Sequence, residues 1–265
     1  MFPFTSPLPS PADIFLFALV LCRIAGLFAA MPLLGGRRVP MRFKAAMVFG
    51  IATVTMPVLQ LTPLPMPADM FGLGILVVKE MLVGVTLGFI TQLIFAAVEF
   101  SGQIIGMQMG FSISQLIDPA QGNQAQIMSV MQILLASLFF LSLNIHHLFI
   151  QAIVDSFKVV PIAGWQMSEE LIRFLVQVSS ELLVLGIRIA APVMVTLLLA
   201  SVVLGVMART FPQMNVFMIS FPMKIGLGFI VLGSTLLIFF HVLEVSFGQL
   251  KQQIDTVYQL MSKGG

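Results

Sequence analysis

The sequence predicts an all-α, polytopic membrane protein with about six hydrophobic helical segments, and three observations support this fold class. The 265 residues are 58% hydrophobic and 9% charged, and the mean hydropathy is +1.05. Apolar windows of roughly 20 residues, the length that spans a hydrocarbon core of about 30 Å, recur six times. The breaks between them are short. This composition is typical of polytopic membrane proteins and lies outside the range of soluble globular domains.

The six windows are, in order, residues 13–34, 43–61, 70–98, 127–150, 171–207 and 216–247. The first is preceded by a helix start, in which Ser10 is the expected N-cap, Pro11 the first helical residue and Asp13 the end of a capping box. The fifth window is so long that a single helix of about 1.5 Å per residue would reach roughly 55 Å. We expect such a helix to tilt, break or leave the membrane.

Basic residues favour one orientation. Arg37, Arg38, Arg42 and Lys44 cluster in the first break, and such clusters near helix ends are typical of cytoplasmic loops. We therefore expect the N-terminus outside and the break after the fifth window, "ARTFPQMN", on the cytoplasmic side.

Charged side chains inside the windows must face protein or water, because each would cost about 2.5–3.5 kcal/mol if it faced lipid mid-span. Lys79 and Glu80 are adjacent, hence about 100° apart on a helix, and each needs a partner on another helix or subunit. Glu181 and Arg188 are seven apart and share a helix face. They fit either an ion relay or an ion pair that holds helices in register.

Several function classes are excluded or disfavoured by missing patterns. The sequence contains no phosphate-binding loop, no GxSxG elbow and no catalytic serine or cysteine constellation. His146 and His147 are adjacent and diverge on a helix, which disfavours a metal site. Lys and Arg are scattered, which argues against nucleic acid as a partner. We expect neither an enzyme nor a cofactor.

Residues 99–126 interrupt the apolar pattern with glycine and glutamine. Gly102, Gly106 and Gly110 recur every four residues, a pattern that lets another backbone pack closely. Gly84 and Gly88 repeat this spacing upstream. Further on, Asp118-Pro119 and Gly122 predict a turn; the whole turn sequence is "IDPAQG".

Non-helical polar backbone at membrane depth is tolerated where it lines a cavity or is buried in protein. Met107, Met109, Phe111 and Ile113 add adaptable apolar bulk. The stretch therefore fits a re-entrant plug, while helix packing and a plain exposed loop remain alternatives.

Several motifs in chain order resemble the FliR family, the flagellar relatives of the SctT proteins of virulence type III secretion. The matching stretches run over nearly the whole chain: "CRIAGLFAAMPLLGGRRVP", "VKEMLVGVTLGF", "GMQMGFSISQLIDPAQGNQ", "LNIHHLFIQAIVDSFKVVP" and "ARTFPQMNVFMISFPMKIGLG". The resemblance implies a non-enzymatic subunit of the flagellar protein export gate. It also implies a location in the bacterial inner membrane, at the flagellum basal body.

The resemblance implies partners as well. One FliR-like chain assembles with FliP and FliQ in a 5:4:1 ratio, near FlhB and FlhA, around a pore for unfolded export substrates. About residues 1–165 would be FliP-like and about 166–265 a FliQ-like hairpin. The embedded charges Lys79, Glu80, Glu181 and Arg188 would then lie at subunit contacts.

Carried over residue by residue, the resemblance implies two sites. The pore plug corresponds to Gly106, Met107, Gln108, Met109, Gly110, Phe111, Ile113, Asp118, Pro119 and Gly122, and the hairpin tip to Arg209, Pro212, Gln213 and Asn215. A virulence subunit of the SctT type is the first alternative. A small-solute secondary transporter is the second, although the sequence lacks the inverted repeat that such transporters carry.

Overall fold

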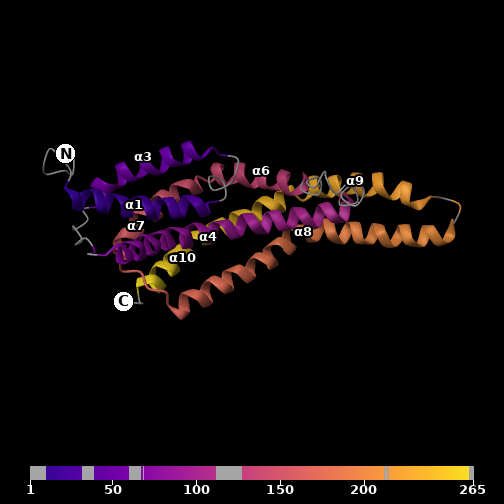
Figure 1. Ribbon diagram of the computed structural model, residues 1–265. Coiled ribbons are helices and arrows are strands. Elements are labelled where there is room, and N and C mark those ends of the chain that lie inside the picture. Colours follow the sequence, from indigo (N-terminus) through magenta and orange to yellow (C-terminus); the bar gives the residue numbers. More distant parts are fainter. Residues whose placement is uncertain are drawn as a thin grey trace. The chain divides into compact units, whose positions relative to one another are not determined.

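The computed structural model describes residues 10–31, 39–59, 67, 69–111, 127–211, 213 and 215–262, apart from the side chain of Phe217. These residues form eight α-helices and contain no strand (Figure 1). The helices are α1 (Pro11–Ala30), α3 (Met41–Leu59), α4 (Met70–Met109), α6 (Ile127–Ser142), α7 (Ile145–Val159), α8 (Glu169–Thr210), α9 (Val216–Ser234) and α10 (Leu236–Ser262). The predicted all-α class is confirmed.

Each apolar window coincides with one helix or with a pair of helices. α1, α3, α4 and α8 are long and apolar enough to cross a membrane singly. The fourth and sixth windows each hold a bent pair, α6 with α7 and α9 with α10, which raises the candidate spans among the described residues to as many as six. The third and fifth windows each lie within a single long helix, of 40 and 42 residues respectively.

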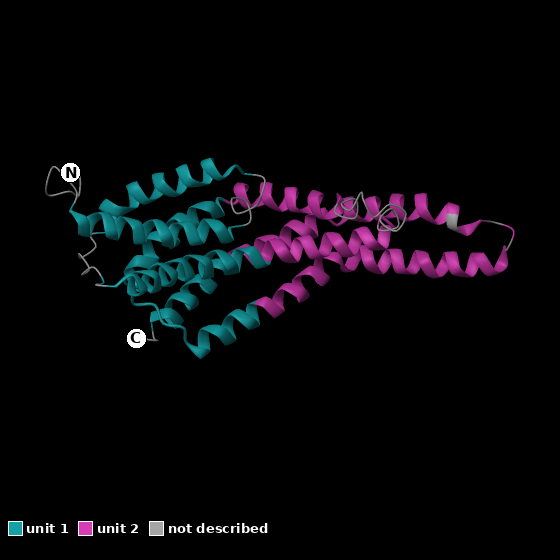
Figure 2. Cartoon of the chain, viewed as in Figure 1, with its two compact units in different colours: residues 1–93, 144–178, 249–265 teal, residues 94–143, 179–248 magenta. Residues whose placement is uncertain are grey.

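The chain divides into two compact units (Figure 2). Unit 1 comprises residues 1–93, 144–178 and 249–265, and unit 2 comprises residues 94–143 and 179–248. α4, α8 and α10 each contribute residues to both units. The division near residue 165 that the resemblance implies, into a FliP-like part and a FliQ-like hairpin, is a different one and stays a prediction.

α1 begins as its sequence predicts. The Ser10 side chain accepts a hydrogen bond from the backbone N–H of Asp13, and the Asp13 carboxylate accepts one from the backbone N–H of Ser10. Pro11 stands at the first helical position, where its missing N–H costs nothing. The expected capping box is confirmed.

In unit 1, α1 and the first part of α4 approach each other backbone to backbone. A Cβ atom added to Gly84 would strike the Arg23 carbonyl and lie 2.7 Å from the Leu27 nitrogen. One added to Gly88 would lie 2.7 Å from the Leu27 oxygen, and Gly26 of α1 meets the α4 backbone equally closely. Small residues permit this distance between helix axes, as the spacing of Gly84 and Gly88 predicted.

The same interface holds a buried ion pair. The Arg23 Nε of α1 lies 2.6 Å from the Glu80 Oε2 of α4, and the two side chains are 2% and 0% exposed. The other carboxylate oxygen, Glu80 Oε1, accepts a hydrogen bond of 3.0 Å from the backbone N–H of Ala163. Glu80 thus finds its ionic partner on another helix of its own chain, and Lys79 at its side remains half-buried.

Arg23 also holds the C-terminal end of α7. Its Nη1 donates to the carbonyl oxygens of Ser156 and Val160, each at 3.0 Å, and its guanidinium lies 4.1 Å from the centre of the Phe157 ring. A cation at the end of a helix is favourable because the last carbonyls there lack helical partners. One arginine therefore joins α1, α4 and α7.

The last turns of α10 belong to unit 1 and are attached by two hydrogen bonds. The Tyr258 hydroxyl donates to the carbonyl of Ala152 on α7 at 2.6 Å. The Ser168 hydroxyl donates to the carbonyl of Leu260 at 3.3 Å and accepts from the backbone N–H of Leu171 in the first turn of α8. Both bonds satisfy polar groups that burial would otherwise leave unpaired.

We expect the buried ion pair to matter most when one partner alone is removed. The Arg23→Met variant should lose about 3–5 kcal/mol of unfolding free energy, because Glu80 is left as an uncompensated buried charge. The double variant Arg23→Met/Glu80→Gln should recover much of this loss, since no charge remains and the amide oxygen can still accept from Ala163. Thermal unfolding of the purified protein in detergent measures both.

The control for this comparison is Arg173→Gln, which removes an exposed ion pair with Glu169 whose side chains are both 77% exposed. We expect a change below about 1 kcal/mol there. A double variant as unstable as Arg23→Met would contradict the assignment.

Candidate functional site

The predicted plug begins at the C-terminal end of α4, within unit 2. The helix ends in a Schellman motif: the N–H of Gly110 bonds to the carbonyl of Met107 at 3.1 Å, and the N–H of Phe111 bonds to the carbonyl of Gly106 at 3.0 Å. Gly110 has φ +91°, a left-handed conformation that glycine adopts without steric cost. Gly110 therefore caps the helix and is not one more residue of a continuous glycine face.

Met109 anchors this end of α4 in the core of unit 2. Its side chain is fully buried, in a cluster whose other buried members are Ile105, Met128, Ala190, Val193 and Leu197. α9 accommodates it at Gly228, where an added Cβ would lie 2.8–2.9 Å from three atoms of the Met109 side chain. The thioether thus occupies a space that any larger residue at Gly228 would fill.

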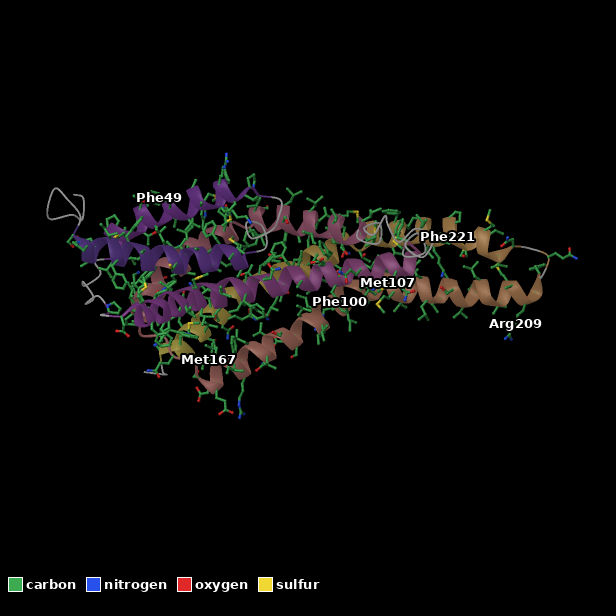
Figure 3. The ribbon with its side chains drawn as sticks, in the orientation of Figure 1. Phe49, Phe100, Met107, Met167, Arg209 and Phe221 are labelled. Carbon is green, nitrogen blue, oxygen red and sulfur yellow. The ribbon has the colours of Figure 1, made fainter. Side chains whose placement is uncertain are left out.

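Met107 and Phe111 differ from Met109 in their surroundings. Met107 is 54% exposed, so its side chain is open at the surface of the chain, and Figure 3 labels it on α4 near the end of the helix. Phe111 is half-buried and packs against the Met109 cluster. Gly110 lies beneath Phe221 of α9, whose ring would be 3.2 Å from an added Cβ. Three bulky residues expected to act together therefore differ: Met109 is a buried anchor, Phe111 is half-buried and Met107 is exposed.

The remaining plug residues predicted from the sequence cannot be placed. Ile113, Asp118, Pro119 and Gly122 lie in residues 112–126, outside the described part of the chain. Gln108 is described and half-buried. The plug as a whole stays a prediction.

Upstream of the plug, α4 packs closely on α6. A Cβ on Gly102 would lie 2.5 Å from the Ser129 Cα, which confirms the close approach that the glycine spacing predicted. Beside it, the Ser101 hydroxyl donates to Gln132 Oε1 at 2.7 Å, and the Ser129 hydroxyl donates to the carbonyl of Glu99 at 3.0 Å. The Ser101–Gln132 hydrogen bond was not predicted from the sequence. The position of Ser101 beside Gly102, where another helix comes close, is the signal that could have indicated it.

The predicted hairpin tip connects α8 and α9. Arg209 is exposed in the last turn of α8, where a cation is favourable beside the free carbonyls (Figure 3). Asn215 is the N-cap of α9, and its side-chain oxygen accepts from the N–H of Met218 at 3.4 Å. Gln213 is exposed, and Pro212 lies outside the described residues. The described polar residues of the tip, Arg209, Gln213 and Asn215, are thus all exposed.

The other charged candidates lie apart from these sites. Glu181 and Arg188 are both exposed on α8, and their proposed role at subunit contacts stays a prediction. Within the described ranges, no group of three or more His, Cys, Asp and Glu side chains is arranged to hold a metal ion.

Comparison with known proteins identifies the family. The model of "Bacterial export proteins, family 1" matches residues 14–250. The flagellar biosynthetic protein FliR of Bacillus subtilis (strain 168) is 34% identical over 252 residues, which cover 94% of this chain and 95% of that protein. The chain belongs to the FliR family. The FliR protein of Escherichia coli (strain K12) is likewise 34% identical, over 78% of this chain and 79% of that protein.

FliR membership confirms the resemblance found in the sequence. The chain is therefore a flagellar biosynthetic protein of the export apparatus, and its apolar helices are those expected of a membrane component. A more distant FliR relative, from Aquifex aeolicus (strain VF5), is 28% identical over 82% of this chain.

Truncation of two methionines near the end of α4 should change the unfolding free energy by very different amounts. Met109→Ala should lower the unfolding free energy by about 2–5 kcal/mol, because it leaves a cavity opposite Gly228. Met107→Ala should change it by less than about 0.5 kcal/mol, because that side chain is exposed. Thermal unfolding of the two variants in detergent tests this contrast, and equal losses would show that Met109 is not the anchor.

Proposed function

We propose that this chain is a subunit of the flagellar type III export gate that helps to form, and at rest to close, the pore for unfolded flagellar proteins. The observation that carries the gating part is the organisation of the α4 end. Gly110 caps the helix, Met109 fixes it in the core of unit 2, and the segment of residues 112–122, which holds the predicted turn, follows directly. A segment that moves aside needs a fixed attachment, and this helix end supplies one.

The proposed occluding residues are those that the core of unit 2 does not fully enclose. Met107 is exposed and Phe111 is half-buried, while Ile113 follows in the same segment. Methionine and phenylalanine fill irregular gaps, and glutamine and glycine suit a segment that folds into a wet cavity. We assign closure to Met107, Phe111 and Ile113, and anchoring to Met109.

The length of α8 supports assembly with other subunits. Its 42 residues extend about 63 Å as a helix, roughly twice the hydrocarbon core. Its exposed apolar residues include Val184, Ile187, Val195, Leu198, Val202 and Val206. Lipid cannot cover such a surface along its whole length, so we propose FliP- and FliQ-like chains as its cover.

The same proposal includes Lys79 and Glu181 at subunit contacts and FlhB- and FlhA-like proteins as neighbours in the inner membrane. The curated relatives are flagellar by description, which favours flagellar over virulence use.

Deleting residues 112–120 tests the plug, because this deletion retains the Gly110 cap. We expect the complex to assemble normally and to leak small ions or dyes when overproduced, since Ile113 and the segment around it no longer help to close the pore. Phe111→Ala should leak partially, whereas Phe111→Leu, which keeps most of the apolar volume, should stay tight. An assembled deletion complex as impermeable as the parent would overturn the plug.

The hairpin tip is tested by Asn215→Leu, which removes the N-cap of α9. Loss of such a cap costs about 0.5–2 kcal/mol locally, and we expect export of flagellar proteins into the medium to fall further than the amount of chain in the membrane. Asn215→Ser should restore export, because serine caps helices equally well. Unchanged export by the leucine variant would remove the tip from the functional site.

A further inference from the structure

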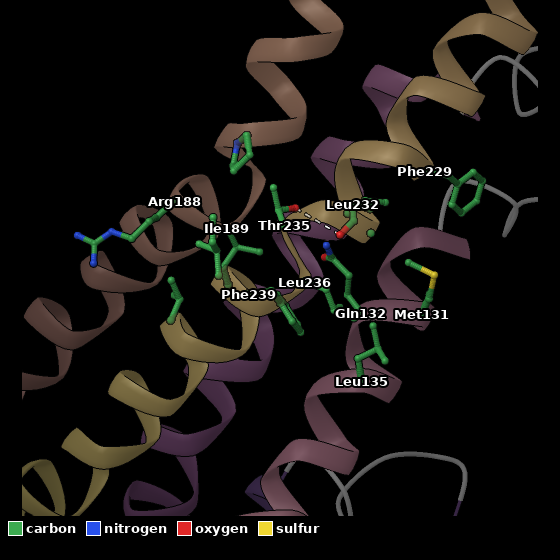
Figure 4. Close-up of a pocket in the computed structure, with 14 residues that line it drawn as sticks. Met131, Gln132, Leu135, Arg188, Ile189, Phe229, Leu232, Thr235, Leu236 and Phe239 are labelled. Atoms are coloured by element: carbon green, nitrogen blue, oxygen red, sulfur yellow. Dashed lines mark hydrogen bonds between the residues drawn. The ribbon is translucent and has the colours of Figure 1, made fainter.

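Unit 2 contains a cavity that neither the plug nor the hairpin tip uses. It has a volume of about 240 Å³ and lies among α6, α8 and the bend where α9 meets α10 at 54° (Figure 4). Most of its wall is apolar, including Leu135, Ile189, Leu232 and Phe239. Pockets that bind small ligands share this character, an apolar wall with a small number of polar groups.

Two polar oxygens of the cavity lining are already engaged. Gln132 accepts a hydrogen bond from Ser101, and the hydroxyl of Thr235 donates to the carbonyl of Val231 at 2.8 Å. With these oxygens engaged, the lining is mostly apolar. A ligand would therefore fill it with hydrocarbon more readily than with polar atoms.

One cation stands at the edge of the cavity. Arg188 contributes to the lining, its side chain is exposed, and among the described residues it forms no ion pair. Figure 4 shows its guanidinium group extending away from the apolar wall formed by Ile189 and Phe239. α8 is a candidate span, in which an arginine is costly unless it meets an anion or water.

We propose that this cavity binds an anionic phospholipid, with one acyl chain in the apolar cavity and the phosphate paired with Arg188. The guanidinium fork matches phosphate oxygens in a bidentate geometry. Phe229 and Ile238 are exposed apolar residues of the lining, and they allow the acyl chain of the lipid to enter from the bilayer without crossing a polar barrier. An anion joined to a flexible hydrocarbon chain matches both parts of the site.

This inference does not depend on the pore plug. It rests on the cavity and on Arg188, and it would stand if the pore plug were disproved.

The test uses the full-length chain in its complex, placed in nanodiscs of equal parts phosphatidylglycerol and phosphatidylcholine, with retained lipid identified by native mass spectrometry. The parent should retain phosphatidylglycerol in preference to phosphatidylcholine. Arg188→Gln should reduce that preference roughly fivefold to tenfold, the effect of one charge-assisted pair. Gly233→Leu should reduce retention of both lipids, because an added side chain there meets no neighbour within 4 Å and can occupy the cavity.

Two matched controls separate binding from damage. Gly226→Leu adds the same side chain to open space on the same helix, outside the cavity lining, and Arg173→Gln removes a cation elsewhere on α8. Both should retain lipid as the parent does. A Gly233→Leu complex with unchanged lipid, or an unchanged lipid preference in Arg188→Gln, would overturn the proposal.

The same experiment detects a protein occupant. If the parent complex retains no phosphatidylglycerol and Gly233→Leu blocks assembly with other subunits, the cavity receives a side chain of a neighbour and the lipid proposal fails. Should Gly233→Leu be unstable while the parent retains lipid, Arg188→Gln decides, because an exposed residue can be replaced without disturbing the core.

Discussion

The Arg23–Glu80 ion pair is the constraint on which unit 1 depends. A buried pair adds little net stability, because desolvation offsets most of the attraction, but breaking it is costly. Any shift of α1 against α4 would leave a charge in an apolar interior. The pair therefore fixes the register of these helices, and Gly84 makes the short distance between them feasible. The Nη1 group of Arg23 extends the same constraint to the end of α7.

In unit 2 the helices are positioned by close apolar packing, whereas in unit 1 an ion pair fixes their register. Gly102 lets α6 approach α4, and Gly228 receives Met109, so the end of α4 is fixed without any ionic contact. An apolar fit of this kind is insensitive to salt and to protonation. It also leaves the side chain of Met107 exposed and without a role in the core, which is the property that an occluding residue of a gate would require.

The sequence indicated the helices, the capping box and the close approach at Gly84, because each depends on local pattern. It did not indicate the breaks within the fourth and sixth windows, since apolar composition continues through them. Pairing Arg23 with Glu80 required knowledge of which helices are neighbours. The division between Met107 and Met109 could have been foreseen in part, because residues two apart on a helix point about 200° apart. Which of the two faces inward depends on tertiary packing.

The wide sequence separation of the ion pair has a consequence for biosynthesis. Arg23 is translated 57 residues before Glu80 and 133 before Ser156. At synthesis rates of about 5–20 residues per second, Glu80 is synthesised roughly 3–11 s after Arg23. During that interval the first helix carries an uncompensated cation and is poorly suited to enter lipid by itself. The first helix therefore reaches its charge-paired position only after α4 has emerged.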